Sequence, residues 1–389
     1  MSGGRRTELG QPNTVSLGRP NTAPAAERRT LGCGVTPRAV DWSLALVVWA
    51  LFATGVLSLY TGSGDEAWIF VAHGVLGFAL AALLVWKLRR VWQRIVDPGA
   101  WDERTGFGFA AVFVVAVAQL SGWIWSSGGE LTVGGYNLLG WHMAVGTLLV
   151  VVVVMHAALR RKPLRARDVA AGRRQLFAAA GVAAGAFAVW QLQRPVSAFF
   201  GLRGAKRRFT GSFERGSFAG NDGFPPTSWV ADRPRAVGGP DYRLRVDGLV
   251  RSPLSLEAAD LAAGDSVEAL IDCTGGWYSR QQWSGVRLDR LIARARAREG
   301  AHHVRVESHT GYRWSFPLSE APKLLIATHV RGEPLSHGHG APARLVAPGR
   351  RGFQWVKWVV RIELIEHADL GAPASTVWSS GTPEGRGEA

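Results

Sequence analysis

Cysteine is nearly absent from this chain: only Cys33 and Cys273 occur among its 389 residues. Zinc sites and iron–sulfur clusters usually take three or four ligands from the protein, so an isolated thiol such as Cys273 cannot build either one. The sequence also contains no zinc-finger or helix-turn-helix pattern, and we therefore expect no nucleic-acid partner. The formal net charge of +15 suits the anionic headgroups of a lipid bilayer instead.

A signal-peptide stretch is likewise missing, because residues 1–37 are rich in Arg, Gly, Pro and Thr and contain no apolar core. We expect this segment, which includes Cys33, to be a disordered cytoplasmic tail. Residues 371–389 are rich in Gly, Pro and Ser, and a second disordered tail is predicted there.

Long apolar runs are abundant in the first half of the chain. Four of them are close to the length of about 20 residues that crosses a bilayer as a helix. A fifth is shorter and rich in alanine and glycine. The runs are Asp41–Tyr60, Ala67–Trp86, Gly106–Trp125, Leu138–Leu159 and Gln175–Leu192. They predict an all-α domain over residues 38–160, followed by a basic loop and a fifth span over residues 161–200.

Lys and Arg are absent from the segments between the first two spans and between the third and fourth. The other connections are strongly basic, and six arginines precede the first span. Because basic residues stay on the cytoplasmic side, the N-terminus is predicted inside a prokaryotic plasma membrane. If the fifth segment also spans, everything after it lies outside. That segment begins Gly172-Arg-Arg-Gln-Leu-Phe177 and resembles a twin-arginine export signal; the alternative is a pair of arginines that merely flank a span.

Three histidines, His73, His142 and His156, lie inside the predicted spans. Ionisable side chains within a membrane are costly and usually functional, although a neighbouring carbonyl or hydroxyl can also satisfy a buried imidazole. His73 and His142 lie at a similar depth, about 6–8 Å below the outer surface at 1.5 Å per residue. Two imidazoles at one depth on antiparallel helices can be the axial ligands of a b-type haem.

His156 follows His142 by fourteen residues, which returns a helix to within about 40° of the same face. Residues 38–160 thereby resemble the cytochrome b subunits of membrane formate dehydrogenases and hydrogenases. In that family an inner-side histidine of the first helix pairs with the deeper one, but the first span here has no histidine. His156 is therefore a relic, a quinone-site donor or a ligand of a second haem.

Cys273 lies in the loop sequence Ile271-Asp-Cys-Thr-Gly-Gly-Trp-Tyr278. By itself such a thiol can be a nucleophile, a buried small hydrophobe, or the sole protein ligand of a metal that brings its other ligands along. Further on the chain reads His339-Gly-Ala-Pro-Ala-Arg344, then Pro348-Gly349, then Val356-Lys-Trp358. In this order the segments resemble the molybdopterin-binding domain of the sulfite oxidase family, over residues 205–367.

The resemblance implies that the Cys273 thiolate ligates molybdenum, with the pterin dithiolene and oxo groups as the other ligands. A soft thiolate suits a metal already bound by sulfur. His339, Arg344 and Lys357 match family positions that bind the cofactor, and a guanidinium can grip an anionic phosphate bidentately. Asn221 falls where family members place polar pterin contacts.

The local pattern fits an α+β, β-rich domain of that kind. Alternating apolar and polar residues predict strands at Tyr242–Val246, His303–Glu307, Ala343–Val346 and Val359–Leu364, and a helix is expected over Leu288–Ala297. The family's immunoglobulin-like dimerisation domain is not expected after residue 367. Of the arginines that line the family's anionic substrate pocket, the candidates are Arg280, Arg313 and Arg351.

Together these features predict a membrane-bound molybdoenzyme in which molybdopterin chemistry at Cys273 is coupled to haem b and the quinone pool. The favoured direction is reduction of an S-oxide such as a methionine-sulfoxide-like substrate. The alternatives are oxidation of sulfite or a related oxyanion, and a membrane sensor that binds pterin without turnover.

Overall fold

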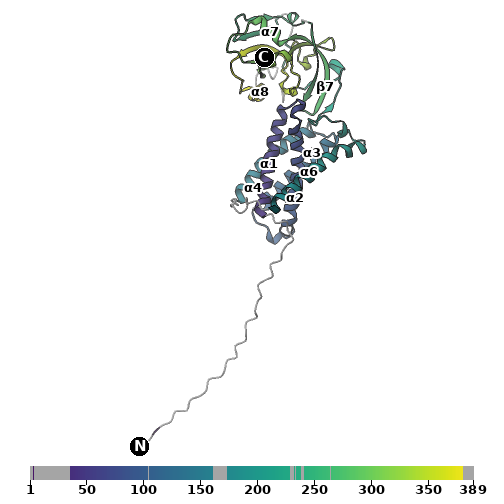
Figure 1. The fold of residues 1–389 in the computed structure, drawn as a ribbon, viewed down its shortest axis with the longest axis vertical. Helices are drawn as coiled ribbons and strands as arrows, with labels where there is room; N and C mark the ends of the chain where they lie inside the picture. The colour runs from purple at the N-terminus through teal and green to yellow at the C-terminus, as the bar shows by residue number, and fades with distance from the viewer. Residues whose placement is uncertain are drawn as a thin grey trace.

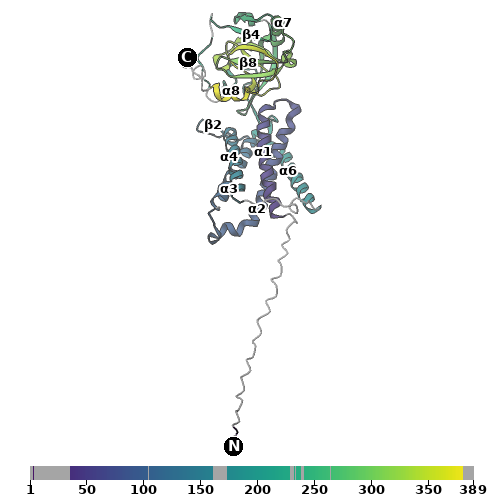
Figure 2. The same ribbon diagram turned by 90° about the vertical axis from the view of Figure 1, so that its left-hand side faces the viewer.

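The computed structural model describes residue 3 and residues 36–103, 105–160, 173–227, 232, 234–237, 241–262 and 264–379 (Figure 1). Cys33, almost all of the predicted N-terminal tail and residues 161–172 of the basic loop lie outside the described residues. The described chain has a helical half and a β-rich half, which lie end to end (Figures 1 and 2).

The helical half consists of α1 Pro37–Tyr60, α2 Ala67–Val96, α3 Thr105–Ser127, α4 Leu138–Arg160 and α6 Arg173–Phe199. All five predicted apolar runs are therefore helical, and α6 is longer than the sequence suggested. The helix α1 packs against α2 and α4, α3 packs against α4, and α6 lies along α2. Each of the five is long and apolar enough to cross a membrane.

The outward faces of these helices are apolar. Leu46 on α1 and Phe113 on α3 are 70% and 69% exposed, whereas the buried cluster between the helices is small and contains Val48, Leu80 and Leu149. A helix that is apolar on all sides is typical of a membrane span, because hydrocarbon rather than water surrounds it. The helical half thus has the surface of a membrane protein.

Two sheets form the β-rich half. The first has strand order β11-β10-β7-β3, with β6 paired to β7 and β12 paired to β10, and the second has the order β5-β4-β13-β8-β9. The first sheet's strands are β3 Phe213–Glu214, β6 Asp265–Cys273, β7 Trp277–Arg287, β10 Leu325–Val330, β11 Glu333–Pro334 and β12 Arg344–Val346. The second sheet's strands are β4 Leu244–Gly248, β5 Leu254–Leu256, β8 His303–Ser308, β9 Arg313–Pro317 and β13 Val359–Ile365.

One continuous core joins these sheets to the helix α7, Leu288–Ala295. The predicted strands match β4, β8, β12 and β13, and the predicted helix matches α7. The expected disorder after Gly371 is wrong for the first turns, because Ala372–Trp378 form α8. Ser375 explains this difference: it is fully buried and exchanges hydrogen bonds with the backbone of Arg313 on β9, a contact that composition cannot reveal.

The two halves touch at the C-terminal ends of α1 and α3 and at the start of α4. Tyr60, at the end of α1, packs its ring against Trp314 and Phe353. Between α3 and α4 the chain forms a short hairpin of β1 Thr132–Val133 and β2 Tyr136–Asn137. Gly134 and Gly135 form its two-residue turn, and both have the positive φ that such a turn requires. This hairpin and the helix ends beside it lie against the β6–β7 connection.

Candidate functional site

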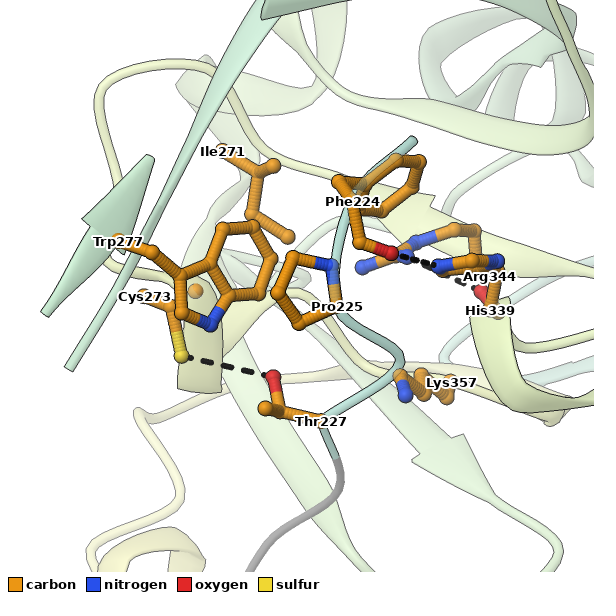
Figure 3. A pocket seen from close by; sticks show the side chains of 10 residues that line it. Phe224, Pro225, Thr227, Ile271, Cys273, Trp277, His339, Arg344 and Lys357 are labelled. Carbon is orange, nitrogen blue, oxygen red and sulfur yellow. Dashed lines mark hydrogen bonds between the residues drawn. The ribbon is translucent and has the colours of Figure 1, made fainter. Parts of the chain in front are cut away.

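A small cavity in the β-rich half lies beside the β6–β7 connection (Figure 3). Four of the residues singled out in the sequence line it together: Cys273, His339, Arg344 and Lys357. Its other lining residues are Phe224, Pro225, Thr227, Ile271, Trp277 and Gly352. Strand pairing and the buried core therefore bring together side chains that are far apart in the sequence.

Cys273 ends β6 and faces Trp277 at the start of β7. Its sulfur accepts a hydrogen bond from the backbone N–H of Gly275 at 3.3 Å and lies 3.5 Å from the hydroxyl oxygen of Thr227 (Figure 3). The thiol is half-buried and forms no disulfide. It is thus held at the cavity wall by a tight turn, in reach of a ligand.

Arg344 provides a buried positive charge on the far side of the cavity. Its side chain is 1% exposed, and its guanidinium donates to the carbonyl oxygen of His339 at 3.0 Å. The guanidinium also lies over the rings of Trp283 and Trp355, at 5.0 Å and 5.7 Å from their centroids. Burial lowers the pKa of Arg344 to about 9. Among the described residues, no carboxylate forms an ion pair with it.

Lys357 and His339 complete the cationic side. Burial, reinforced by the charge of Arg344, lowers the pKa of Lys357 to about 7, and its ammonium donates to the carbonyl of Gly338 at 2.5 Å. Burial also lowers the pKa of His339 to about 4, so this imidazole is neutral at pH 7. Its Nε2 donates to the carbonyl of Phe224 at 3.0 Å, which leaves Nδ1 to accept from the hydroxyl of Ser336 at 2.8 Å.

The donor set of this cavity fits an anionic, sulfur-liganded cofactor. Buried cations without a carboxylate partner are costly, and an anion bound between Arg344 and Lys357 would offset that cost. Two buried nitrogens, Nε of Arg344 and Nε1 of Trp277, have no hydrogen-bond partner among the described residues. Buried donors of this kind normally have partners. A phosphate-bearing organic group with a metal bound at Cys273 would meet each of these needs.

Asn221 lies outside the cavity lining. Its amide donates to the carbonyl of Pro334 at 2.9 Å and accepts from the N–H of Ser336 at 2.8 Å. Both ends of the side chain are therefore engaged by the loop that leads to His339. In the structure Asn221 holds the loop that leads to His339 and does not line the cavity.

The three candidate substrate arginines are dispersed. Arg280 forms an ion pair with Glu268, and Arg313 forms one with Asp369, both away from the cavity. Only Arg351 approaches the cysteine loop, where it donates to the carbonyl of Cys273 at 3.3 Å.

Asp272, the residue before Cys273, is a buried anchor that sequence reasoning missed. Its carboxylate is 1% exposed and accepts from the hydroxyls of Thr210 and Ser212 at 2.8 Å and 2.7 Å. It also forms ion pairs with Arg208 and Arg351. Arg208 belongs to a basic run at residues 206–208, and its ion pair with Asp272 helps to fix the cysteine strand.

A second cluster lies in the helical half. His73 on α2 and His142 on α4 face each other with ring centroids 6.1 Å apart and planes at 84°. Thr54 Oγ1 lies 3.0 Å from Nδ1 of His73, and Ser121 Oγ lies 3.2 Å from Nδ1 of His142. The carbonyl of Ala118 also accepts a hydrogen bond from Nδ1 of His142 at 3.0 Å, so the proton of this imidazole lies on Nδ1. On each ring the hydrogen bonds occupy Nδ1 and leave Nε2 as the candidate ligand atom.

The same two-residue unit supports each imidazole. Thr54-Gly55 on α1 lies behind His73, and Ser121-Gly122 on α3 lies behind His142. A Cβ at Gly55 would lie 3.5 Å from the His73 ring, and one at Gly122 would lie 3.0 Å from the His142 ring. Glycine allows the rings to approach these helices, and the hydroxyls orient them.

The spacing of the two rings fits one metal atom between them. An imidazole nitrogen lies about 2 Å from a bound metal, which puts the ring centroid about 3 Å away and two opposed rings about 6 Å apart. The glycines on α2 and α4 near these histidines differ from one another. Gly74 instead accommodates the indole of Trp190 on α6. At Gly77 and Gly146 a Cβ would meet no described atom within 3.6 Å beyond its chain neighbours and its own helix backbone.

His156 lies on α4, half-buried and fourteen residues after His142. Within the described residues, α1 carries no histidine and no group of three or more His, Cys, Asp or Glu side chains could hold a metal ion. The second haem ligand set therefore stays a prediction.

The comparisons with known proteins concern the β-rich half. The family model described as the oxidoreductase molybdopterin-binding domain matches residues 231–372. The protein-methionine-sulfoxide reductase catalytic subunit MsrP of Gluconobacter oxydans is 30% identical over 165 residues, which cover 37% of this chain and 51% of that protein. The mitochondrial sulfite oxidase of Rattus norvegicus is 32% identical over 151 residues, or 33% of this chain and 28% of that one.

The uncharacterized oxidoreductase YuiH of Bacillus subtilis is 31% identical over 135 residues, which cover 33% of this chain and 68% of that protein. The chain spans about half the length of the MsrP relatives that it matches. This coverage and identity, together with a single thiol that faces buried cations across a shared cavity, show that the chain belongs to the molybdopterin-binding oxidoreductase family.

Proposed function

We propose that the chain is a membrane-bound molybdoenzyme that draws electrons from a membrane quinol and reduces an S-oxide at Cys273. The observation that carries this proposal is the contact between the two halves: the cysteine loop rests on the outer ends of α3 and α4, and α4 also carries His142. In the overall reaction the quinol becomes a quinone and gives up two electrons and two protons. The S-oxide accepts the two electrons and the two protons, and its oxygen leaves as water.

The molybdenum centre would be held by Cys273 as the sole protein ligand of the metal. Arg344 and Lys357 would bind the anionic phosphate of the pterin, and neutral His339, whose two ring nitrogens are hydrogen-bonded to Phe224 and Ser336, would form part of the wall beside it. When bound, this group supplies oxygen-atom transfer with two electrons. The protein's own contribution is a dry, positively charged cavity, in which burial strengthens each electrostatic contact.

The placement of the arginines supports an uncharged substrate. A site for a small oxyanion needs cations that are not already neutralised. Arg280 and Arg313 are paired with carboxylates away from the cavity, and Arg351 is paired with Asp272. A methionine-sulfoxide-like substrate needs no such cation, and the MsrP relatives are named for that activity. Sulfite oxidation, for which the sulfite oxidase relative is named, is the second candidate.

The electron source would be one haem b between His73 and His142, in a cytochrome b-like four-helix unit made of α1 to α4. The pair lies toward the outer ends of its helices, on the side that faces the molybdopterin domain. The alternation of basic connections supports a plasma-membrane topology with the N-terminus inside and this domain outside.

The test uses the full chain purified in detergent from cells able to make both cofactors. Molybdenum and iron are measured per chain, and the oxidation of a short-chain quinol is followed with methionine sulfoxide. We expect one molybdenum, one iron, and quinol oxidation that depends on the S-oxide. Reduction of quinone by sulfite, without S-oxide-dependent quinol oxidation, would favour the second candidate. Iron without molybdenum would overturn the assignment of Cys273.

A further inference from the structure

Asn137 occupies the junction between the two halves. It is the last residue of the β1–β2 hairpin and directly precedes α4. Its Oδ1 accepts a hydrogen bond from the backbone N–H of Gly140 at 2.9 Å, which is the usual contact of an N-cap side chain. One end of the amide is therefore fixed by the helix.

The other end of the same amide reaches the cysteine loop. Its Nδ2 donates to the carbonyl oxygen of Gly275 at 2.7 Å, and the N–H of Gly275 donates to the sulfur of Cys273 at 3.3 Å. Asn137, at the start of α4, is thus linked to the sulfur of Cys273 through Gly275. His142 lies five residues further along the same helix.

The surrounding contacts hold the loop flat against the helix ends. Gly276 has φ +88°, and a Cβ there would lie 2.2 Å from the ring of Trp125 and 3.0 Å from Leu139. Trp125 donates from its indole to the carbonyl of Gly211 at 3.0 Å, so its ring is fixed. Residues 274–276 therefore lie between the cysteine sulfur and the helical half, and Asn137 donates a hydrogen bond to them across that surface.

We propose that Asn137 is a positioning residue for Cys273, which sets the N–H···S hydrogen bond on the sulfur from the helical half. This inference rests on the proposed ligation of molybdenum by Cys273. A hydrogen bond to a thiolate withdraws electron density from the sulfur and stabilises the more negative, reduced state of a metal bound to it. Membrane helices would in this way tune the metal centre of the outer domain.

Two substitutions separate this role from helix capping. Both Asn137→Ser and Asn137→Asp keep a good N-cap oxygen for Gly140. Serine is too short to reach Gly275, and aspartate presents an acceptor where a donor is needed. Val133→Ala is the matched control, because Val133 is half exposed on the same hairpin and its side chain takes no part in these bonds.

The measurement is a redox titration of the molybdenum electron paramagnetic resonance signal in the full-length holoprotein, with metal content determined in parallel. We expect both Asn137 variants to keep wild-type metal content and to shift the molybdenum potential to more negative values. Val133→Ala should leave the molybdenum potential at the wild-type value. A potential that stays at the wild-type value in both variants would overturn the inference while leaving the proposed function intact. A wild-type protein without molybdenum would instead overturn the proposed function.

Thermal melting covers the case in which a variant loses its metal. If Asn137→Ser and Asn137→Asp melt with the wild type and yet bind no molybdenum, positioning of Cys273 is supported by the loss of metal itself. If the metal-free forms of both Asn137 variants melt well below the metal-free form of Val133→Ala, Asn137 stabilises the junction between the halves and the inference is wrong.

Discussion

Gly276→Ala should separate the cysteine loop from the helices on which it rests. Gly276 has φ +88°, and a methyl group there would lie 2.2 Å from the Trp125 ring. Gly300, in the connection from α7 to β8, has φ +90°, and apart from its two chain neighbours no described residue lies within 4 Å of the place its Cβ would take. Alanine in this backbone conformation costs about 1–2 kcal/mol at either site. The difference between the two variants therefore isolates the clash at the junction.

The contacts at risk set the size of that difference. If the loop moves away from the helices, the hydrogen bonds from Asn137 to Gly275 and from Trp125 to Gly211 are lost, at about 1 kcal/mol each. The edge-to-face contact of Trp125 with Phe213, with centroids 5.3 Å apart, adds about 0.5–1.5 kcal/mol. We expect Gly276→Ala to be about 3 kcal/mol less stable than Gly300→Ala.

Thermal melting of the full-length protein in detergent provides the assay. At about 2–4 °C per kcal/mol for a domain of 150–250 residues, the two variants should differ in Tm by about 6–12 °C. Quinol-linked turnover should also fall in Gly276→Ala and be retained in Gly300→Ala. Equal melting temperatures and equal turnover in the two variants would refute the idea that the loop is held against Trp125.

Three further predictions concern the cofactor sites. His142→Ala should abolish the haem absorbance band of the purified protein, whereas His156→Ala should retain it; the ligand assignment is wrong if the band survives in His142→Ala. Cys273→Ser should lose S-oxide reduction while it keeps the haem band, and retained turnover with a normal metal content would exclude the thiolate as a required ligand. Burial lowers the pKa of Lys357 to about 7, far below its usual 10.5, so the unfolded chain binds more protons between these values. Cofactor-free protein should therefore gain stability as pH rises from about 7 to about 10.5, by at most about 1.4 kcal/mol per pH unit. Lys357→Met should flatten that part of the profile, and an unchanged slope in chemical denaturation would contradict the buried lysine.

Local pattern was sufficient for much of the architecture. The five apolar runs predicted α1 to α4 and α6, because a helix that faces hydrocarbon must be apolar along its whole length. Alternation predicted β4, β8, β12 and β13. The end of the chain shows the limit of this reasoning: Gly371–Trp378 looks disordered by composition, but burial of Ser375 against β9 makes part of it helical.

The candidate cofactor residues show the same limit of sequence reasoning. Cys273, His339, Arg344 and Lys357 could be named from an ordered set of motifs, because a cofactor of fixed chemistry demands a thiolate and cations. The contacts of Asp272 and Asn221 could not be read from the sequence, since their partners are more than 50 residues away; a pterin contact of Asn221 stays a prediction. Thr54 and Ser121 were also missed, because their histidine partners lie on a different helix, 19 and 21 residues away, although each precedes a glycine.

The sequence by itself therefore determined the two halves of this protein, the family of the second half and the single cysteine proposed as its metal ligand, because composition, periodicity and motif order are local properties. Only the tertiary structure decided that His73 and His142 lie 6.1 Å apart, that the candidate arginines are dispersed and paired, and that Asn137 reaches the cysteine loop. Each of these depends on how distant segments pack, and packing is fixed by the shape of the whole buried core and not by any one stretch of chain.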